Sequence, residues 1–307
     1  MNIVVAILSI YVFILFGFIA KKIFKEQIQE RGMSIITVYF LHPIFSFWGL
    51  STRPITLSLL QVPFYYVLIS CVTIALGYIF ARLFFTDNKE KAIMSIAVAL
   101  GNTGNLGIPL GIALFGEESI IYTSMISVAN TFMTYTLGVF FYSGGTSNLK
   151  ASLLNIVKLP VIWASFIALA LNFAHVQIPP TIFKSLEMGA YCMIVLQLIV
   201  FGMYLCNVKI KTLNYKLLLH VNLVKFIFAP LLSAWILFYL LPLEPLVAAI
   251  LLVQLIMPLA LNNINVAAIY GCNPVDVASL VFFTSFIFIP YLMFISYLLN
   301  YFHIVSL

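Results

Sequence analysis

Long uncharged stretches, separated by short charged segments, dominate the pattern of hydrophobic and polar positions. Cutting the chain at every Asp, Glu, Lys and Arg leaves ten charge-free runs of at least 18 residues. A helix needs about 20 apolar residues to cross the hydrocarbon core of a bilayer. The pattern therefore predicts ten transmembrane helices, at 1–20, 32–52, 54–81, 92–116, 119–149, 159–183, 188–208, 226–243, 245–275 and 277–307.

Composition supports an all-α polytopic membrane protein and excludes other classes. Hydrophobic residues make up 64% of the 307 residues and charged residues 8%, whereas soluble domains carry about 25% charged residues. The continuous runs lack the alternation of transmembrane β-strands. The net charge of +6 comes from positive residues between apolar runs, so no nucleic-acid partner is expected. The four scattered cysteines form no CxxC spacing, so neither a disulfide-built secreted fold nor a metal site is expected.

Basic residues fall mainly on one side of the predicted membrane. The connections after helices 1, 3, 5, 7 and 9 carry 12 Lys and Arg residues, whereas the other connections carry only Arg53 and Lys184. Because cytoplasmic loops are rich in Lys and Arg, we expect both termini on the outer side of the membrane. We expect that membrane to be the plasma membrane. The first run is not a cleaved signal peptide, since no basic residue precedes it and its positive residues follow it.

The ten predicted helices divide into two sets of five. An odd number of helices in a repeat requires the second copy to insert upside down, so we expect inverted repeats. The Gly- and Ser-containing stretch 144–148 is the natural joint between them. The expected repeats are therefore 1–145 and 146–307, with no soluble domain because every connection is short.

The fourth helix of each half is interrupted in the middle of its span. Seven of the nine residues in 101–109 are Gly, Asn, Thr or Pro, and Pro258 is followed by three Asn residues within 262–265. Irregular backbone at membrane depth is tolerated only against protein or a water-filled cavity. Interruptions at corresponding places in two halves indicate a transporter's midplane binding site, although small and polar residues also mediate helix packing.

The segment 101–110, Gly-Asn-Thr-Gly-Asn-Leu-Gly-Ile-Pro-Leu, resembles the fourth-helix motif of the auxin efflux carrier family, within the bile acid/auxin transporter superfamily. The similarity extends over essentially the whole chain. Unlike the plant carriers, the chain has Gly101 where they have Pro before the Asn, and it lacks their long central loop. Further similarities are His42-Pro43, Lys225 with Pro230, Met257-Pro258, and Ala268-Ile269-Tyr270-Gly271 leading to Asp276 and Ser279.

The resemblance implies a fold and a class of substrate. It implies ten helices in two inverted repeats, with helices 4 and 9 crossing at their breaks. Helices 1, 2, 6 and 7 would form a scaffold, compatible with a homodimer, and helices 3–5 and 8–10 would carry the site. The family carries organic anions: auxin in plants, and malate- or malonate-like acids in bacteria.

The candidate site contains amides and hydroxyls but no acidic residue in either break, which favours an anionic substrate. Half-helix N-termini and Asn side chains suit a carboxylate without a buried charge. Lys225 is either a counter-charge or a snorkelling lysine, and His42 either a proton sensor or a core histidine at a kink. The candidate substrate-binding residues are Asn102, Thr103, Asn105, Asn262, Asn263, Asn265, Lys225 and His42. The candidate crossover residues are Gly101, Gly104, Gly107, Pro109 and Pro258.

Together these features predict a secondary carrier of small organic anions, mono- or dicarboxylates such as malate-like acids, that works by alternating access. No catalytic residue and no cofactor are expected, and H⁺ and Na⁺ both stay open as coupling ions. A ligand-binding sensor on the same fold and a passive anion channel are the alternatives. An intramembrane enzyme is disfavoured because helices 4 and 9 hold no paired Asp, no Ser–His pair and no HExxH motif.

Overall fold

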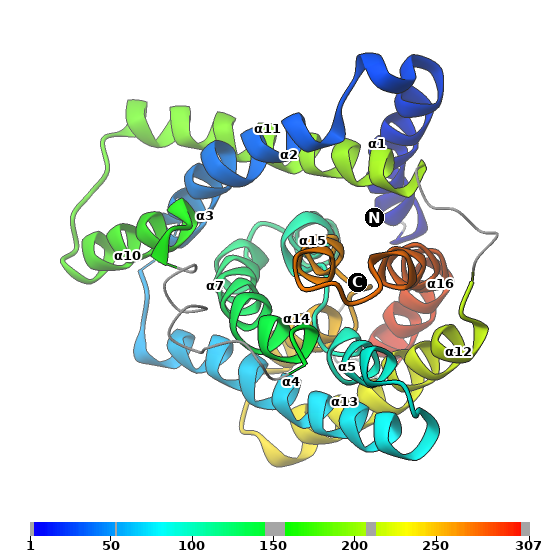
Figure 1. The fold of residues 1–307 in the computed structure, drawn as a ribbon. Coiled ribbons are helices and arrows are strands. Elements are labelled where there is room, and N and C mark those ends of the chain that lie inside the picture. The colour runs from blue at the N-terminus through cyan, green and yellow to red at the C-terminus, as the bar shows by residue number, and fades with distance from the viewer. Residues whose placement is uncertain (1–2, 53, 145–156, 207–212, 302–307) are drawn as a thin grey trace.

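The computed structural model describes residues 3–52, 54–144, 157–206 and 213–301. Within these ranges the chain is helical, without a β-strand (Figure 1). The helices of the first part are α1 (Ile3–Phe24), α2 (Glu30–Ile36), α3 (His42–Ser51), α4 (Leu57–Phe84), α5 (Asn88–Ala97), α6 (Ile108–Phe115), α7 (Ser119–Met133) and α8 (Val139–Tyr142). Those of the second part are α10 (Pro160–Phe173), α11 (Pro180–Cys206), α12 (Tyr215–Leu223), α13 (Ala229–Trp235), α14 (Pro245–Leu255), α15 (Asn262–Ile269) and α16 (Pro274–Tyr301).

Six continuous helical stretches of the described chain are long and apolar enough to cross a bilayer. Several of them join two α-helices through a wider turn, as in α2–α3, α7–α8 and α12–α13. Shorter apolar helices lie at 103–115, 160–173 and 245–255. The six stretches are Glu30–Ser51, Leu59–Phe84, Ser119–Tyr142, Pro180–Cys206, Tyr215–Leu240 and Pro274–Tyr301.

Proline explains most of the wider, π-helical turns. Pro43, Pro109, Pro230 and Pro242 each stand two residues after such a turn. Proline has no N–H to donate, and its ring clashes with the carbonyl four residues earlier. The helix widens there, and donors bond one residue further back: His42 N–H donates to Thr37 O, and Ala229 N–H to Val224 O. These turns are Thr37–Leu41, Thr103–Gly107, Val224–Phe228 and Ile236–Leu240.

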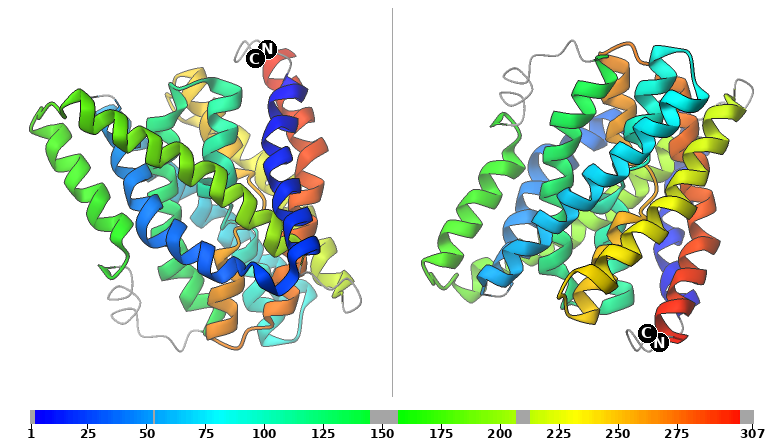
Figure 2. Two further views of the ribbon diagram at one scale, coloured as in Figure 1. Left: turned by 90° about the horizontal axis from the view of Figure 1, so that it is seen from above. Right: turned by 90° about the horizontal axis from the view of Figure 1, so that it is seen from below.

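The helices form two groups. An outer layer of α1, α2, α3, α10 and α11 runs along one side of the molecule, and the other helices gather beside it as the main body (Figure 1). Within the outer layer α1 packs on α11, and α10 packs on α3. The α1–α11 contact requires glycine, because a Cβ on Gly17 would overlap Ile199 O and one on Gly202 would overlap Ile14 O. The start of α1 and the end of α16 lie at the same end of the molecule (Figure 2).

Two expected helix boundaries are wrong. The stretch of α12 and α13 begins at Tyr215 instead of 226, because Lys225, which ended the charge-free run, is buried inside the helix. The run 159–183 contains α10, a connection and the first turn of α11, which begins at Pro180 instead of 188. Lys184 and Glu187 are tolerated there because they stay exposed or half-buried near the helix end. The expected boundary between repeats, at 145–146, lies outside the described residues.

Candidate functional site

Two helices are interrupted, and their interruptions meet. The first break runs from Val98 to Asn102, between α5 and the helix 103–115; the second, 256–261, separates α14 from α15. Asn102 N–H donates to Pro258 O at 2.7 Å, and Ala260 N–H donates to Leu100 O at 3.1 Å. Gly101 and Leu259 thus form an isolated antiparallel bridge. The breaks complete each other's backbone hydrogen bonding, as irregular backbone requires where water is scarce.

Side chains from neighbouring helices satisfy further backbone groups of the first break. Asn130 of α7 donates through Nδ2 to Gly101 O at 2.8 Å, and its Oδ1 accepts from Tyr66 OH at 3.0 Å. Lys225 Nζ donates to Val98 O at 3.1 Å. Gln254 Nε2 donates to Gly107 O at 2.7 Å, just beyond the break. The first break is therefore held from three helices other than its own.

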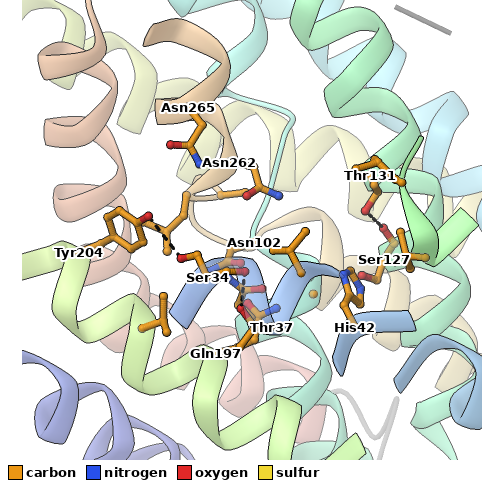
Figure 3. Close-up of a pocket in the computed structure, with 18 of the residues that line it drawn as sticks. Ser34, Thr37, His42, Asn102, Ser127, Thr131, Gln197, Tyr204, Asn262 and Asn265 are labelled. Atoms are coloured by element: carbon orange, nitrogen blue, oxygen red, sulfur yellow. Dashed lines mark hydrogen bonds between the residues drawn. The ribbon is translucent and has the colours of Figure 1, made fainter. Parts of the chain in front are cut away.

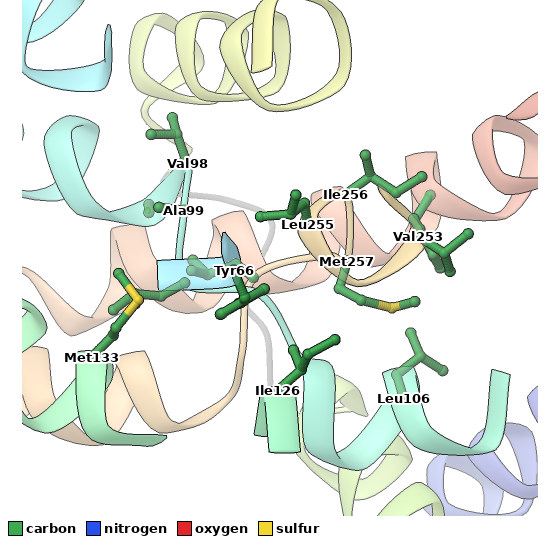
Figure 4. Close-up of a cluster of buried hydrophobic side chains, with 14 of the residues drawn as sticks. Tyr66, Val98, Ala99, Leu106, Ile126, Met133, Val253, Leu255, Ile256 and Met257 are labelled. Atoms are coloured by element: carbon green, nitrogen blue, oxygen red, sulfur yellow. The ribbon is translucent and has the colours of Figure 1, made fainter. Parts of the chain in front are cut away.

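Side chains also hold the second break. Leu259 N–H donates to Thr284 Oγ1 of α16 at 3.1 Å. Asn263 is fully buried; its Nδ2 donates to Ala260 O at 3.0 Å and its Oδ1 accepts from Tyr142 OH at 3.1 Å. Buried apolar side chains surround both breaks, among them Leu106, Ile126, Ile256 and Met257 (Figure 4). This packing excludes water from one side of the crossing.

A cavity of about 660 Å³ lies on the other side of the crossing, between the outer layer and the main body. The outer layer contributes residues of α2, the turn 37–41, α10 and α11, and the main body contributes the first break, α7 and α15. Figure 3 shows Asn102 between two groups of polar side chains, Asn262 and Asn265 of α15 and Gln197 and Tyr204 of α11. A volume of this size is within the range of small-molecule sites.

Most of the predicted site residues line this cavity, and some do not. Asn263 and Lys225 are absent from its wall, since their polar groups bond to the backbone of the breaks. Lys225 does not snorkel, because only 1% of it is exposed. Gly107, Pro109 and Pro258 also lie away from the wall. The predicted residues that line it are His42, Gly101, Asn102, Thr103, Gly104, Asn105, Asn262 and Asn265.

Two polar groups at the first break lack a hydrogen-bond partner. Asn102 is 3% exposed and Thr103 is fully buried, yet Nδ2 of Asn102 and Oγ1 of Thr103 make no hydrogen bond within the described residues. Both residues line the cavity. A buried donor without a partner costs free energy until a ligand or water satisfies it. Hydrogen-bonding groups of Asn102 and Thr103 thus stay unused beside the cavity in the described structure.

The charge of the cavity wall is confined to one end. Glu30 and Arg31, at the start of α2, are the charged residues among its lining. Glu30 Oε2 lies 2.9 Å from Lys21 Nζ, so its charge is paired, whereas Arg31 is exposed. The wall near Asn102 therefore offers neutral donors and acceptors, and among the described lining residues Arg31 is a cation without a carboxylate within salt-bridge distance.

Sequence reasoning missed several lining residues. Ser34 donates through Oγ to Tyr204 OH at 3.3 Å, and Thr131 donates through Oγ1 to Ser127 O at 2.9 Å (Figure 3). Asn130 lines the cavity as well as holding Gly101. A lone Asn in an apolar run was the available signal for Asn130. Ser and Thr carry no such signal, because they often bond to their own helix, as Thr131 does.

The fold and the cavity define a multi-pass membrane transporter. Residues 2–296 match the model of the membrane transport protein family, and the chain belongs to this family. This confirms the resemblance to the auxin efflux carriers. The chain is 26% identical over 293 residues to an uncharacterized transporter of Methanocaldococcus jannaschii, covering 91% of this chain and 93% of the relative. It is 24% identical over 171 residues to an uncharacterized transporter of Methanothermobacter thermautotrophicus, covering 54% and 56% of the two chains.

Proposed function

We propose that this chain is a secondary carrier of small organic anions, mono- or dicarboxylates, whose substrate site lies at the first break, in the cavity between the two helix groups. The observation that carries the proposal is the unpartnered Nδ2 of Asn102 at the cavity wall. A carboxylate oxygen satisfies such a donor without a second buried charge. Thr103 Oγ1 offers a second group one residue away.

The substrate's negative charge is supported by the distribution of charged residues. Glu30, the one acidic residue in the described lining, is paired with Lys21, and Arg31 stands near it at the start of α2. The helix 103–115 also begins at the cavity, and helix N-termini carry partial positive charge. A cationic substrate would meet no free carboxylate among the described lining residues.

We infer ten membrane crossings in two inverted five-helix repeats. To the six long stretches this adds α1, α10 and the two interrupted pairs, α5 with 103–115 and α14 with α15. In an inverted repeat, helix 1 corresponds to helix 6 and helix 2 to helix 7. The packing of helix 1 on helix 7 (α1 on α11) and of helix 6 on helix 2 (α10 on α3) is one contact between the repeats, made twice with the roles of the repeats exchanged. An even number of crossings also agrees with the start of α1 and the end of α16 lying at one end of the molecule (Figure 2).

We further infer that the cavity opens toward the cytoplasm. Arg31, Tyr204 and Ile269 line it and lie near the connections that follow α1, α11 and α15. These connections are on the side that holds most of the basic residues. At the opposite end, α3 and α7 are in close contact, because a Cβ on Gly49 would overlap Ser124 Oγ. Alternating access would open this contact and close the cavity, as the main body moves against the outer layer.

Uptake by proteoliposomes containing the purified protein tests the proposal. A panel of mono- and dicarboxylates is offered to the wild type, to Asn102→Ala and to Asn222→Ala, a control at a membrane-embedded Asn that does not line the cavity. Losing a donor to a charged ligand costs about 1.5–3 kcal/mol, or about ten- to a hundredfold in affinity. We expect this loss for Asn102→Ala and none for Asn222→Ala.

Asn102→Ala is expected to leave folding nearly unchanged, because Nδ2 of its side chain has no partner among the described residues and its backbone N–H still reaches Pro258 O. An unchanged substrate affinity in the folded variant would remove Asn102 from the site. Flux that neither saturates nor shows exchange of substrate across the membrane would favour a channel over a carrier.

A further inference from the structure

Lys225 places an ammonium group at the end of a half-helix. It lies on the stretch formed by α12 and α13, is 1% exposed, and its Nζ is 3.1 Å from Val98 O. In the described part of the chain no carboxylate lies within salt-bridge distance of it. A buried charge without a counter-ion is costly, so it needs another compensation.

The compensation is the carboxyl end of α5. Val98 is the first residue after α5, and in a continuous helix its carbonyl would accept from Asn102 N–H. Asn102 N–H turns away to Pro258 O instead. Lys225 Nζ supplies the missing donor to Val98 O. It also places a positive charge where the helix dipole is negative.

Transporters with broken helices commonly hold a coupling cation at this kind of position. Unwound carbonyls and the carboxyl ends of half-helices coordinate Na⁺ in such proteins. Lys225 fills an equivalent position with a cation that is part of the chain. At the carboxyl end of α14, the described chain places no Lys or Arg side chain in a comparable position. Backbone N–H groups donate there instead, Ile256 to Leu252 O and Met257 to Gln254 O, and Leu259 N–H donates to Thr284 Oγ1.

We propose that the Lys225 ammonium replaces a coupling cation, so that substrate transport by this chain needs no Na⁺, and that removing this ammonium creates a requirement for Na⁺. The positive charge stays within the main body. It stabilises an anion bound at Asn102, which is four residues after Val98 in the chain. The inference rests on the proposed function for its transport readout. It makes Lys225 a positioning residue, which acts on the site through the backbone of the first break.

Charge and hydrogen bonding are separated by a set of variants. Lys225→Arg keeps the charge, Lys225→Gln keeps a donor without the charge, and Lys225→Ser leaves space at Val98 O. Lys216→Ser is the matched control, an exposed lysine on the same helix. Uptake by proteoliposomes and thermal stability in detergent are measured in NaCl and in choline chloride.

We expect the wild type, Lys225→Arg and Lys216→Ser to transport at the same rate in both salts. Lys225→Gln and Lys225→Ser should lose about tenfold or more in choline chloride, the effect of one charge-assisted hydrogen bond. NaCl should restore part of the uptake by Lys225→Ser. NaCl should also raise the melting temperature of Lys225→Ser relative to choline chloride, without raising that of the wild type.

Two results would overturn the inference. One is a wild type that requires Na⁺ for uptake, and the other is a Lys225→Gln variant that transports normally in choline chloride. The stability measurement needs no transport. If the wild type carries none of the carboxylates, the proposed function fails, while the Na⁺ effect on the melting temperature of Lys225→Ser still decides the role of Lys225. Absence of that effect would also overturn the inference.

Discussion

The amides at the two breaks differ in their burial and in their hydrogen-bond partners. At the first break, Asn102 and Thr103 hold buried polar groups that make no hydrogen bond to the described part of the chain. At the second break, Asn263 is bonded on both sides of its amide, while Asn262 is half-buried and Asn265 is exposed to the cavity. Similar residues in the two interrupted helices therefore have different roles: Asn263 bonds to the protein, whereas Asn102 keeps an unused donor.

This difference between the breaks predicts which of them contributes more to the free energy of substrate binding. A donor that has already lost its water gains the full hydrogen bond when a ligand arrives, whereas an exposed amide must first give up water. The preorganised donors are at the first break, so this break should dominate affinity. The second break should mainly support the first, since Pro258 O and Ala260 N–H hold Asn102 and Leu100 in place.

The largest loss of stability is expected from Asn130→Leu. This substitution removes the side-chain donor to Gly101 O and the amide acceptor of Tyr66 OH, both of them buried groups. Each such group costs about 1–3 kcal/mol. Thermal unfolding in detergent should show a large drop in melting temperature, compared with Asn222→Ala as a control away from the breaks. A variant as stable as the wild type would mean that the first break needs no support from α7.

Asn263→Ala should show a smaller loss of stability with little loss of affinity. It leaves Tyr142 OH unpaired, while Ala260 O keeps its bond from the Asn263 N–H. One unpaired buried group costs about 1–3 kcal/mol. The melting temperature should fall, and the folded fraction should bind substrate normally. Asn102→Ala should instead lower substrate affinity and leave the melting temperature nearly unchanged. Equal changes of affinity and melting temperature in the two variants would contradict the proposed difference between the breaks.

The sequence predicts the interruptions and the part of the cavity wall that they form, but not the rest of the wall or the hydrogen bonds behind it. Gly, Asn and Pro at 101–109 and 258–265 are unusual in a membrane span, so the breaks and Asn102 could be found from residue types. The direction of a side chain could not. Both the lipid-facing and core-facing sides of these helices are apolar, so the pattern does not say which face Lys225 occupies. Its buried contact with Val98 O joins residues 127 positions apart in the chain.

The prediction of helix boundaries from the sequence had a related weakness, because it did not distinguish buried from exposed charged residues. Cutting at charged residues assumes that a charge ends a span, which fails for the buried Lys225 and for Lys184 and Glu187 inside α11. The hydrogen bonds of Asn130 and Asn263 were also out of reach, because an amide in an apolar run suits a ligand and a backbone carbonyl equally well. Only the fold shows that Asn263 faces Tyr142 and that Nδ2 of Asn102 has no partner among the described residues.

The smallest loss of substrate affinity is expected from Asn265→Ala. This variant compares the two breaks directly, because Asn265 and Asn102 line the same cavity. Asn265 lines the same cavity but is exposed, so its amide exchanges water for ligand with a net gain of about 0.5–1.5 kcal/mol. Affinity should fall about two- to tenfold, less than for Asn102→Ala, and the melting temperature should not change. Substrate competition measured on both purified variants compares them directly. A larger loss for Asn265→Ala than for Asn102→Ala would place the main contact at the second break. The unpartnered amide of Asn102 would then belong to the resting geometry of the crossing and not to recognition of the substrate.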